Sequence, residues 1–144
     1  MSVSAGSSIS TVSSVSTVSS IKADVSVLHR LLGGPVPEEG CPSRFVLNHV
    51  TSKWGVLVLV ALAEQTLRWG ELRRAVQGIS EKMLAQTLQT LERDGLVHRE
   101  ALPVVPPHVE YRLTELGDDL VERLLPLVIW SAEHGQEIRD RWED

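Results

Sequence analysis

Residues 71–97 read ELRRAVQGISEKMLAQTLQTLERDGLV, and residues 109–113 read VEYRL. Apolar residues recur at helical spacing in the first stretch and alternate with charged residues in the second. This order predicts a short helix, a tight turn, a second amphipathic helix and then a β-ribbon. The order of these elements is typical of a DNA-binding helix-turn-helix followed by a wing.

Capping residues mark both ends of the second helix. Ser80 is a favourable N-cap, because its hydroxyl can accept a hydrogen bond from an amide two or three residues later. Glu81 then lies at the positive end of the helix dipole. The helix should stop at Asp94-Gly95, since glycine adopts the left-handed conformation after the last turn.

The second helix carries an apolar stripe and, opposite it, a polar face. The stripe consists of Leu84, Leu88 and Leu91. The polar face has amide and cationic side chains that can hydrogen-bond to DNA bases and phosphates: Lys82, Gln86, Gln89 and Arg93. Any solvated helix face can show such residues. The preceding helix around residues 71–76, with Arg73 and Arg74 outward, and the turn at Gly78 favour a helix-turn-helix.

A β-ribbon is predicted after Gly95. Residues 109–113 alternate as a half-buried strand, residues 97–102 supply its partner, and the prolines between them indicate a stiff loop. The fold class is therefore mainly α (α+β), a winged helix-turn-helix with a two-stranded wing. Arg99 and His108 are candidate phosphate or minor-groove contacts, with a structural loop role as the alternative for His108.

The chain resembles the HxlR-type bacterial transcriptional regulators over about residues 41–135. The resemblance is carried by Cys41-Pro42, Lys53-Trp54, Glu71-Leu72-Arg73, Gly78-Ile79-Ser80, Met83-Leu84, Gln86, Leu88, Leu91-Glu92, Asp94-Gly95-Leu96-Val97, Val105-Pro106-Pro107, Val109-Glu110-Tyr111, Leu113-Thr114 and Leu116-Gly117. It implies a homodimeric winged-helix protein over residues 41–140 that binds double-stranded DNA at a pseudo-palindromic operator, with terminal helices forming the dimer.

Three positions depart from the family pattern. The family often has arginine where this chain has Gln89 and His108, so the side facing DNA carries less positive charge. The usual serine or threonine cap of the first helix is Gly70 here, a modest loss of capping. These changes bear on base preference and on the affinity of the wing, and they leave the predicted fold unaltered.

The charge of the chain is unevenly distributed. The 144 residues carry 14 Lys+Arg and 19 Asp+Glu, a net charge of −5. Residues 68–112 have a net charge of +1, whereas residues 113–144 have a net charge of −6. The excess of acidic residues therefore lies outside the predicted DNA-binding segment. That segment itself has only a small positive net charge and does not form a strongly basic patch. Affinity should depend on a few phosphate contacts and on dimerisation.

A terminal helix is predicted after Thr114. Its stripe contains Leu116, Leu120, Leu124, Leu127 and Trp130 and suits a partner subunit, although a core helix would show the same pattern. Two recognition helices related by a two-fold axis would meet successive major grooves. Nearer the N-terminus, residues 44–50 and 54–62 indicate two core helices.

The first forty residues are predicted to lie outside the domain. Residues 1–20 are half serine and uncharged, which indicates a disordered tail and not a signal peptide. Residues 21–40 indicate a short helix followed by a Gly/Pro linker. No apolar run approaches transmembrane length, so no membrane contact is expected, and a single cysteine suits a reducing cytoplasm.

Cys41 is the only cysteine, so no disulfide can form within the chain. Pro42 is favourable as the first residue of a helix, and this places the thiol near a positive helix end that lowers its pKa. In the HxlR-type family several members use a cysteine here to sense oxidants or electrophiles. The alternative is an inert, partly buried thiol.

Enzyme and metal functions are not expected. Nothing orients His49 as a base for Cys41, the five histidines lack paired ligand spacing, and no glycine-rich phosphate loop is present, so no cofactor is predicted. The sequence, with its resemblance to the HxlR-type family, predicts a dimeric transcriptional repressor that binds specific DNA, and for Cys41 a response to oxidants or electrophiles and an inert thiol are equally expected. Two alternatives stay open: a winged-helix module that binds protein, and a regulator switched by a small-molecule ligand.

Overall fold

A computed structural model describes residues 25–144 and divides them into two units, with the boundary after Phe45. In the first unit residues 25–32 form a helix, which ends at Gly33 in the left-handed region, with φ 73°. The amide of Gly33 donates to the carbonyl of His29 over 2.9 Å. The tail predicted over residues 1–20 and the first four residues of the predicted 21–40 segment lie outside the described residues.

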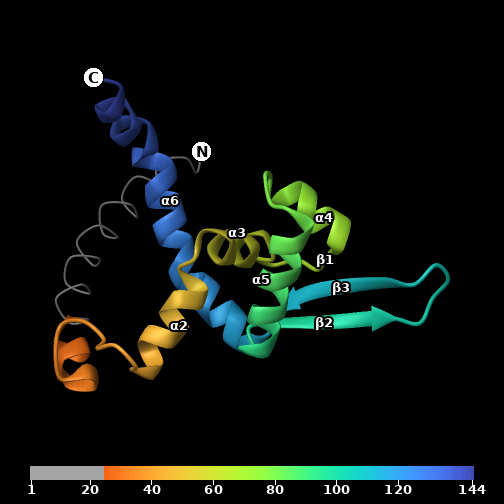
Figure 1. The fold of residues 1–144 in the computed structure, drawn as a ribbon, viewed down its shortest axis with the longest axis horizontal. Helices are drawn as coiled ribbons and strands as arrows, with labels where there is room; N and C mark the ends of the chain where they lie inside the picture. Colours follow the sequence, from red (N-terminus) through yellow and green to blue (C-terminus); the bar gives the residue numbers. More distant parts are fainter. Residues whose placement is uncertain (1–24) are drawn as a thin grey trace, which may run out of the picture. The chain divides into compact units, whose positions relative to one another are not determined.

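The second unit holds the predicted helix-turn-helix and wing (Figure 1). Along the chain the elements are α2 (Pro42–Val50), which begins in the first unit, α3 (Lys53–Ala61), β1 (Leu67–Arg68), α4 (Trp69–Ala75), α5 (Glu81–Arg93), β2 (Val97–Leu102), β3 (His108–Leu113) and α6 (Glu115–Glu143). The predicted fold class, mainly helical with a small antiparallel sheet, is confirmed.

The sheet contains one strand more than the predicted two-stranded wing. Its order is β1-β3-β2, with β2 and β3 paired from Val97↔Leu113 to Leu102↔His108. The short β1 pairs with β3 through Leu67↔Tyr111 and is only two residues long. A strand of that length has no periodicity, so sequence patterns cannot reveal it.

The core is built around the apolar stripe of α5. Leu84, Leu88 and Leu91 are 0%, 2% and 1% exposed, as the helical spacing predicts. They pack in one cluster with Val58 and Leu59 of α3, and α3 contacts α5 directly. The stripe therefore fixes α5 in the domain and leaves its opposite side to solvent.

The prediction that residues 44–50 and 54–62 are core helices is only partly right. In α2, of the residues described, only Val50 is buried, while Val46 and Leu47 are exposed. In α3, Val58 and Leu59 are buried but Leu57 is 41% exposed. Periodicity places residues on a helix face but does not say whether the same chain covers that face.

The apolar stripe of α6 is divided in the same way. Leu124 belongs to the core, whereas Leu116, Leu127 and Trp130 remain 58%, 55% and 50% exposed. The helix begins directly after Thr114, as predicted, and Thr114 is its N-cap, because its hydroxyl accepts a hydrogen bond from the Gly117 amide over 3.1 Å. A substantial part of this apolar face is therefore open in the single chain.

Candidate nucleic-acid interface

The first helix of the motif begins earlier than predicted. α4 starts at Trp69 with Arg68 as N-cap, so Gly70 lies inside the first turn and not at the cap position assigned to it. The Glu71 carboxylate accepts a hydrogen bond from the Arg68 amide over 3.0 Å. This contact provides an acceptor for one of the unpaired backbone amides at the start of α4. The Arg68 side chain contains only hydrogen-bond donors, so it cannot accept a hydrogen bond from another of these amides.

The turn between α4 and α5 has the predicted geometry. Gly78 has φ 87°, a conformation that residues with a Cβ rarely adopt, and Ile79 beside it is buried. The Ser80 hydroxyl then accepts a hydrogen bond from the Met83 amide over 3.1 Å. These contacts set the direction of α5 relative to α4.

The far end of α5 is held by a turn and by a tertiary contact. The Gly95 amide donates to the Glu92 carbonyl over 3.0 Å and the Leu96 amide to the Leu91 carbonyl over 2.9 Å, as in a Schellman motif. His49 Nδ1 lies 2.8 Å from the Asp94 carboxylate, a hydrogen bond between α2 and the C-cap of α5. Sequence reasoning missed this pair, since no local pattern connects residues 45 positions apart.

The polar face of α5 is accessible and uncommitted. Its four members, Lys82, Gln86, Gln89 and Arg93, are all exposed. Within residues 25–144 none of these side chains has a hydrogen-bond or ion-pair partner. The structure thus brings together the residues predicted to contact bases, on the side of α5 opposite its buried leucines.

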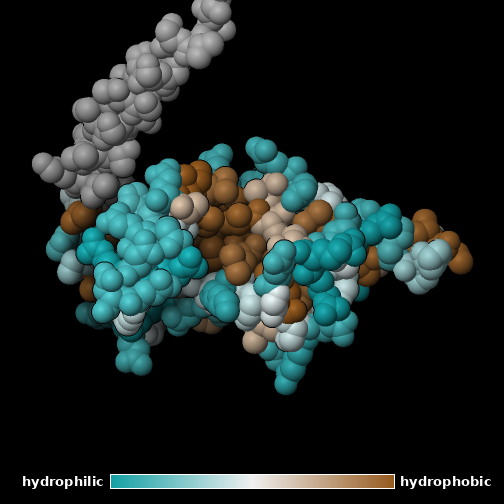
Figure 2. Space-filling model, turned by 90° about the horizontal axis from the view of Figure 1, so that it is seen from above, coloured by the Kyte–Doolittle hydropathy of each residue, from teal (hydrophilic) through white to brown (hydrophobic). Residues whose placement is uncertain are grey.

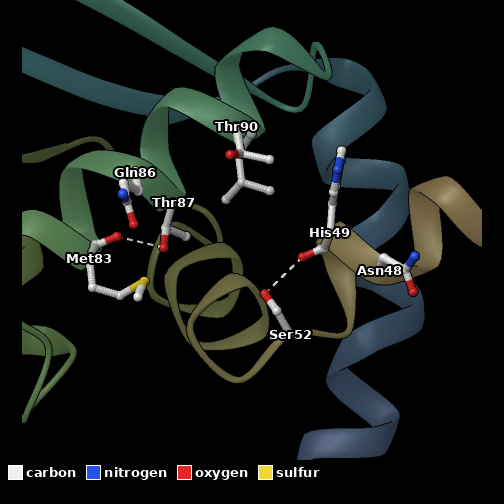
Figure 3. Close-up of a pocket in the computed structure, with 8 residues that line it drawn as sticks. Asn48, His49, Ser52, Met83, Gln86, Thr87 and Thr90 are labelled. Carbon is white, nitrogen blue, oxygen red and sulfur yellow. Dashed lines mark hydrogen bonds between the residues drawn. The ribbon is translucent and has the colours of Figure 1, made fainter.

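A groove of about 230 Å³ runs along one edge of this face. Figure 3 shows Gln86, Thr87 and Thr90 of α5 on one side, with His49 and Ser52 from the corner between α2 and α3 on the other. Ser52 caps α3, and its hydroxyl also donates to the His49 carbonyl over 2.9 Å. Gln86 is therefore at the border between the polar face and this groove.

The two arginines of α4 have different surroundings. Arg73 is in an exposed ion pair with Glu81, 3.0 Å between Nη1 and Oε1. Arg74 forms no hydrogen bond or ion pair with the described residues. Both line an open groove of about 550 Å³ that also includes Ser80 at the start of α5. Arg74 is therefore the more available cation beside the turn.

The register of the wing places Arg99 on the face of the ribbon that packs on the core. Arg99 is opposite Tyr111, and opposed residues of an antiparallel pair share a face, so Arg99 lies on the core side and not with Glu110 and Arg112. It is exposed because the ribbon extends beyond the core. His108 Nε2 is 3.9 Å from the Glu110 carboxylate, which competes with any phosphate for the imidazole.

The arginines of α6 are committed to neighbouring side chains. Arg123 pairs with Asp119 at 2.7 Å, Arg141 pairs with Glu137 at 2.9 Å, and Arg139 donates to Gln136 over 2.7 Å. The two ion pairs contribute little stability, but they neutralise Arg123 and Arg141 locally. Among the described residues, the helix-turn-helix and the wing hold five exposed cations without a hydrogen-bond or ion-pair partner, Arg74, Lys82, Arg93, Arg99 and Arg112, and three more lie elsewhere, Arg30, Lys53 and Arg68.

Cys41 directly precedes α2, as Pro42 predicted. Its Sγ lies 3.2 Å from the Ser43 hydroxyl, and the thiol is partly exposed. The hydrogen bond from the Ser43 side chain, together with the backbone amides of Ser43 and Arg44, lowers the pKa of the Cys41 thiol below its ordinary value. At a given pH these contacts therefore increase the fraction of Cys41 present as thiolate, the nucleophilic form.

Residues 25–144 hold no group of three or more His, Cys, Asp or Glu side chains placed to bind a metal ion. Among the helices of the same residues, none combines the length and apolar character that crossing a membrane requires.

Known proteins with the same pattern are transcriptional regulators. The HTH-type transcriptional regulator YtfH of Escherichia coli is 56% identical over 108 residues, covering 75% of this chain and 86% of the relative. The solved structure of the transcriptional regulator YtfH from Salmonella typhimurium is 51% identical, with a TM-score of 0.69, and covers 74% of this chain and 96% of that one. The redox regulator HypR in its oxidized form is 38% identical, with a TM-score of 0.61, covering 65% of this chain and 96% of its own.

The family pattern itself covers most of the second unit. The HxlR-like helix-turn-helix pattern matches residues 49–139, from the last turn of α2 almost to the end of α6. The matched proteins are regulators of transcription and not enzymes. Fold, motif order and sequence identity agree, and the chain belongs to the HxlR-like helix-turn-helix family.

Proposed function

We propose that this protein is a dimeric transcriptional repressor that recognises a pseudo-palindromic DNA operator through α5. The observation that carries the proposal is the uncommitted polar face of α5, fixed at both ends by Ser80 and Asp94. Amide side chains such as Gln86 and Gln89 can form paired hydrogen bonds with adenine in the major groove. Lys82 and Arg93 can bind guanine edges or phosphates.

The distribution of free cations supports the same surface. Arg74 beside the turn and Arg99 on the wing flank the polar face and have no partner among the described residues. Few cations are available, so binding should rest on a small number of phosphate contacts in each subunit. Two subunits would double that number and supply the affinity that one subunit lacks.

The exposed apolar side chains of α6 support the dimer. Leu116, Leu127 and Trp130 are each at least half exposed, and Trp142 is 87% exposed. Soluble monomers rarely leave so many large apolar groups along one helix in water. A two-fold arrangement would cover them and place two copies of α5 toward one side of the duplex.

A mobility-shift experiment tests the proposal on the gene's own upstream intergenic DNA. Specific binding should weaken steeply as salt rises, with a log–log slope of about 0.9 per phosphate contact. Lys82→Ala should reduce the slope if Lys82 binds phosphate, whereas Arg139→Ala, whose arginine is committed within α6, is the matched control. Absence of specific binding at low salt would favour the protein-interaction module.

Regulation through Cys41 is a second element of the proposed function. Its support is the lowered pKa of the thiol beside Ser43 and the similarity to a protein named as a redox regulator. With one cysteine in each chain, oxidation would give an intersubunit disulfide or a mixed disulfide with a small thiol. Diamide should abolish operator binding and a reductant should restore it, and Cys41→Ser should be insensitive. A Cys41→Ser variant that still responds to the cell's inducer would favour a small-molecule ligand.

A further inference from the structure

The tip of the wing is entirely apolar. Residues 101–107 read ALPVVPP and contain no charged or hydrogen-bonding side chain. Val105 is 100% exposed and Val104 is 45% exposed. Figure 2 shows hydrophobic atoms at the far right, where the ribbon of β2 and β3 ends in Figure 1. A projecting loop is therefore tipped with valines that the described part of the chain leaves uncovered.

This composition is unusual for a hairpin loop. Loops between antiparallel strands favour glycine, asparagine and aspartate, which are polar and adapt to tight turns. Here Pro103, Pro106 and Pro107 restrict the backbone instead, so less conformational entropy is lost when the loop docks on a partner. The loop combines restricted backbone freedom with exposed apolar surface, which suits insertion into a narrow apolar space.

The two faces of the ribbon differ in charge. On one face Glu100 stands directly opposite Glu110, and these two carboxylates outnumber the single arginine of that face, Arg112, which is opposite His98. The other face carries Arg99 opposite Tyr111, followed by Ala101 opposite Val109, and then the tip. Between the core and the tip, the Arg99 face therefore carries one unpaired cation, Arg99, and no acidic residue.

The Arg99 face is also the side on which the helices pack. Val97, Tyr111 and Leu113 share it and are buried in the core cluster that includes the stripe of α5. α5 and β2 are in direct contact. DNA lying along the polar face of α5 would consequently approach the wing from its Arg99 side.

We propose that the wing tip is an apolar wedge that enters the minor groove beside the site read by α5. Val105, with Val104 behind it, would contact the deoxyribose walls and partly unstack one base step. Apolar side chains inserted in this way unstack and kink DNA, most readily at flexible pyrimidine–purine steps. The proposal rests on the proposed function, and it adds specificity at positions that α5 does not touch.

The test uses the full chain and an operator duplex with 2-aminopurine in place of single adenines across the flanking minor groove. Wild-type protein should raise the fluorescence at one flanking step, because unstacking relieves quenching. Val104→Ser/Val105→Ser should abolish that increase and weaken operator binding about tenfold, as expected for losing partly buried valine surface. Val104→Ile/Val105→Ile keeps the apolar surface and should retain both effects.

The outcomes separate the wedge from the regulator itself. Specific wild-type binding without a fluorescence increase, or serine variants that bind as tightly as wild type, would overturn the wedge and leave the regulator intact. Failure of wild-type protein to bind any upstream DNA specifically would overturn both. Since Val105 is 100% exposed and Val104 is 45% exposed, the serine variants should melt close to the wild-type temperature, and this measurement separates misfolding from weaker binding.

Discussion

α5 and α6 are both amphipathic helices with a leucine stripe, but the single chain covers only one of the two stripes. Leu84 and Leu88 of α5 are 0% and 2% exposed, whereas Leu116 and Leu127 of α6 are 58% and 55% exposed. The polar face of α5 has no hydrogen-bond or ion-pair partner among the described residues, while the three arginines of α6 pair with neighbouring side chains of the same helix. We infer that α5 buries its apolar stripe within the single chain and presents hydrogen-bonding and cationic side chains to DNA. In contrast, α6 presents exposed apolar side chains to a second copy of the chain.

Truncating one leucine from each stripe should have very different effects on stability. Leu84→Ala should lower the free energy of unfolding by about 2–5 kcal/mol, because it leaves a cavity in a closed core. Leu127→Ala removes the same atoms from a half-exposed site. It should therefore lower the free energy of unfolding much less when the protein is diluted to a concentration at which it is monomeric. Urea unfolding at low concentration measures both. Equal losses would mean that the two stripes are buried alike.

A charged residue in the apolar stripe of α6 tests whether this stripe forms the proposed dimer interface. Leu127→Glu should shift the protein from dimer to monomer in analytical ultracentrifugation, since a carboxylate in an apolar interface loses its hydration. A dissociation constant raised by about tenfold or more is expected, which is 1.4 kcal/mol or more. Leu31→Glu changes another exposed leucine, outside α6, and is the control. A dimer indifferent to Leu127→Glu would exclude this part of α6 from the interface.

Changing the outward face of α5 should alter specificity and leave the fold unaffected. Gln86→Ala should relax base preference at one operator position, by about 1–3 kcal/mol. A binding-site selection measures this, with Glu92→Ala, on an exposed part of α5 outside the polar face, as control. Unchanged selectivity would remove Gln86 from the base contacts and leave it as a wall of the groove beside His49.

Sequence patterns predicted what is local in this molecule. Ser80 and Thr114 as N-caps and Gly95 as a helix stop follow from chemistry within four residues, and the structure has all three. The fold class and the exposed polar face of α5 follow from periodicity, which a helix must obey whatever surrounds it. The roles of these side chains in DNA binding remain predictions.

What sequence patterns missed depends on tertiary placement. The face of Arg99 is set by strand register, because a shift of one residue would move it to the other side of the ribbon. The bond between His49 and Asp94 joins elements far apart in sequence. The exposure of Leu57 and Leu127 depends on whether other elements of the same chain pack against them, and the periodicity of a helix contains no information on that.

The His49–Asp94 contact holds the C-terminal end of α5. His49→Ala should lower the free energy of unfolding by about 1 kcal/mol, since the bond is partly exposed and one partner is a carboxylate. If the bond also positions α5, the ratio of specific to non-specific DNA affinity should fall at temperatures where the variant is fully folded. His49→Asn keeps a donor near Nδ1 and should restore part of both. A lower melting temperature with an unchanged ratio would show a stabilising role alone.

The smallest expected effect concerns two helix starts, Ser80 before α5 and Cys41 before α2. Ser80 accepts the Met83 amide with a neutral hydroxyl, whereas the Cys41 thiolate is stabilised by the Ser43 hydroxyl and nearby amides. Because these groups lower the pKa of the thiol, alkylation by iodoacetamide should accelerate at a lower pH in folded protein than in urea-unfolded chain. Ser43→Ala removes the largest cause and should move the profile of the folded protein toward higher pH. Some of the shift should persist, since the amides of Ser43 and Arg44 remain. Coincident profiles for folded and unfolded protein would mean that the start of α2 does nothing to the thiol, and Cys41 would then lose its support as a sensor.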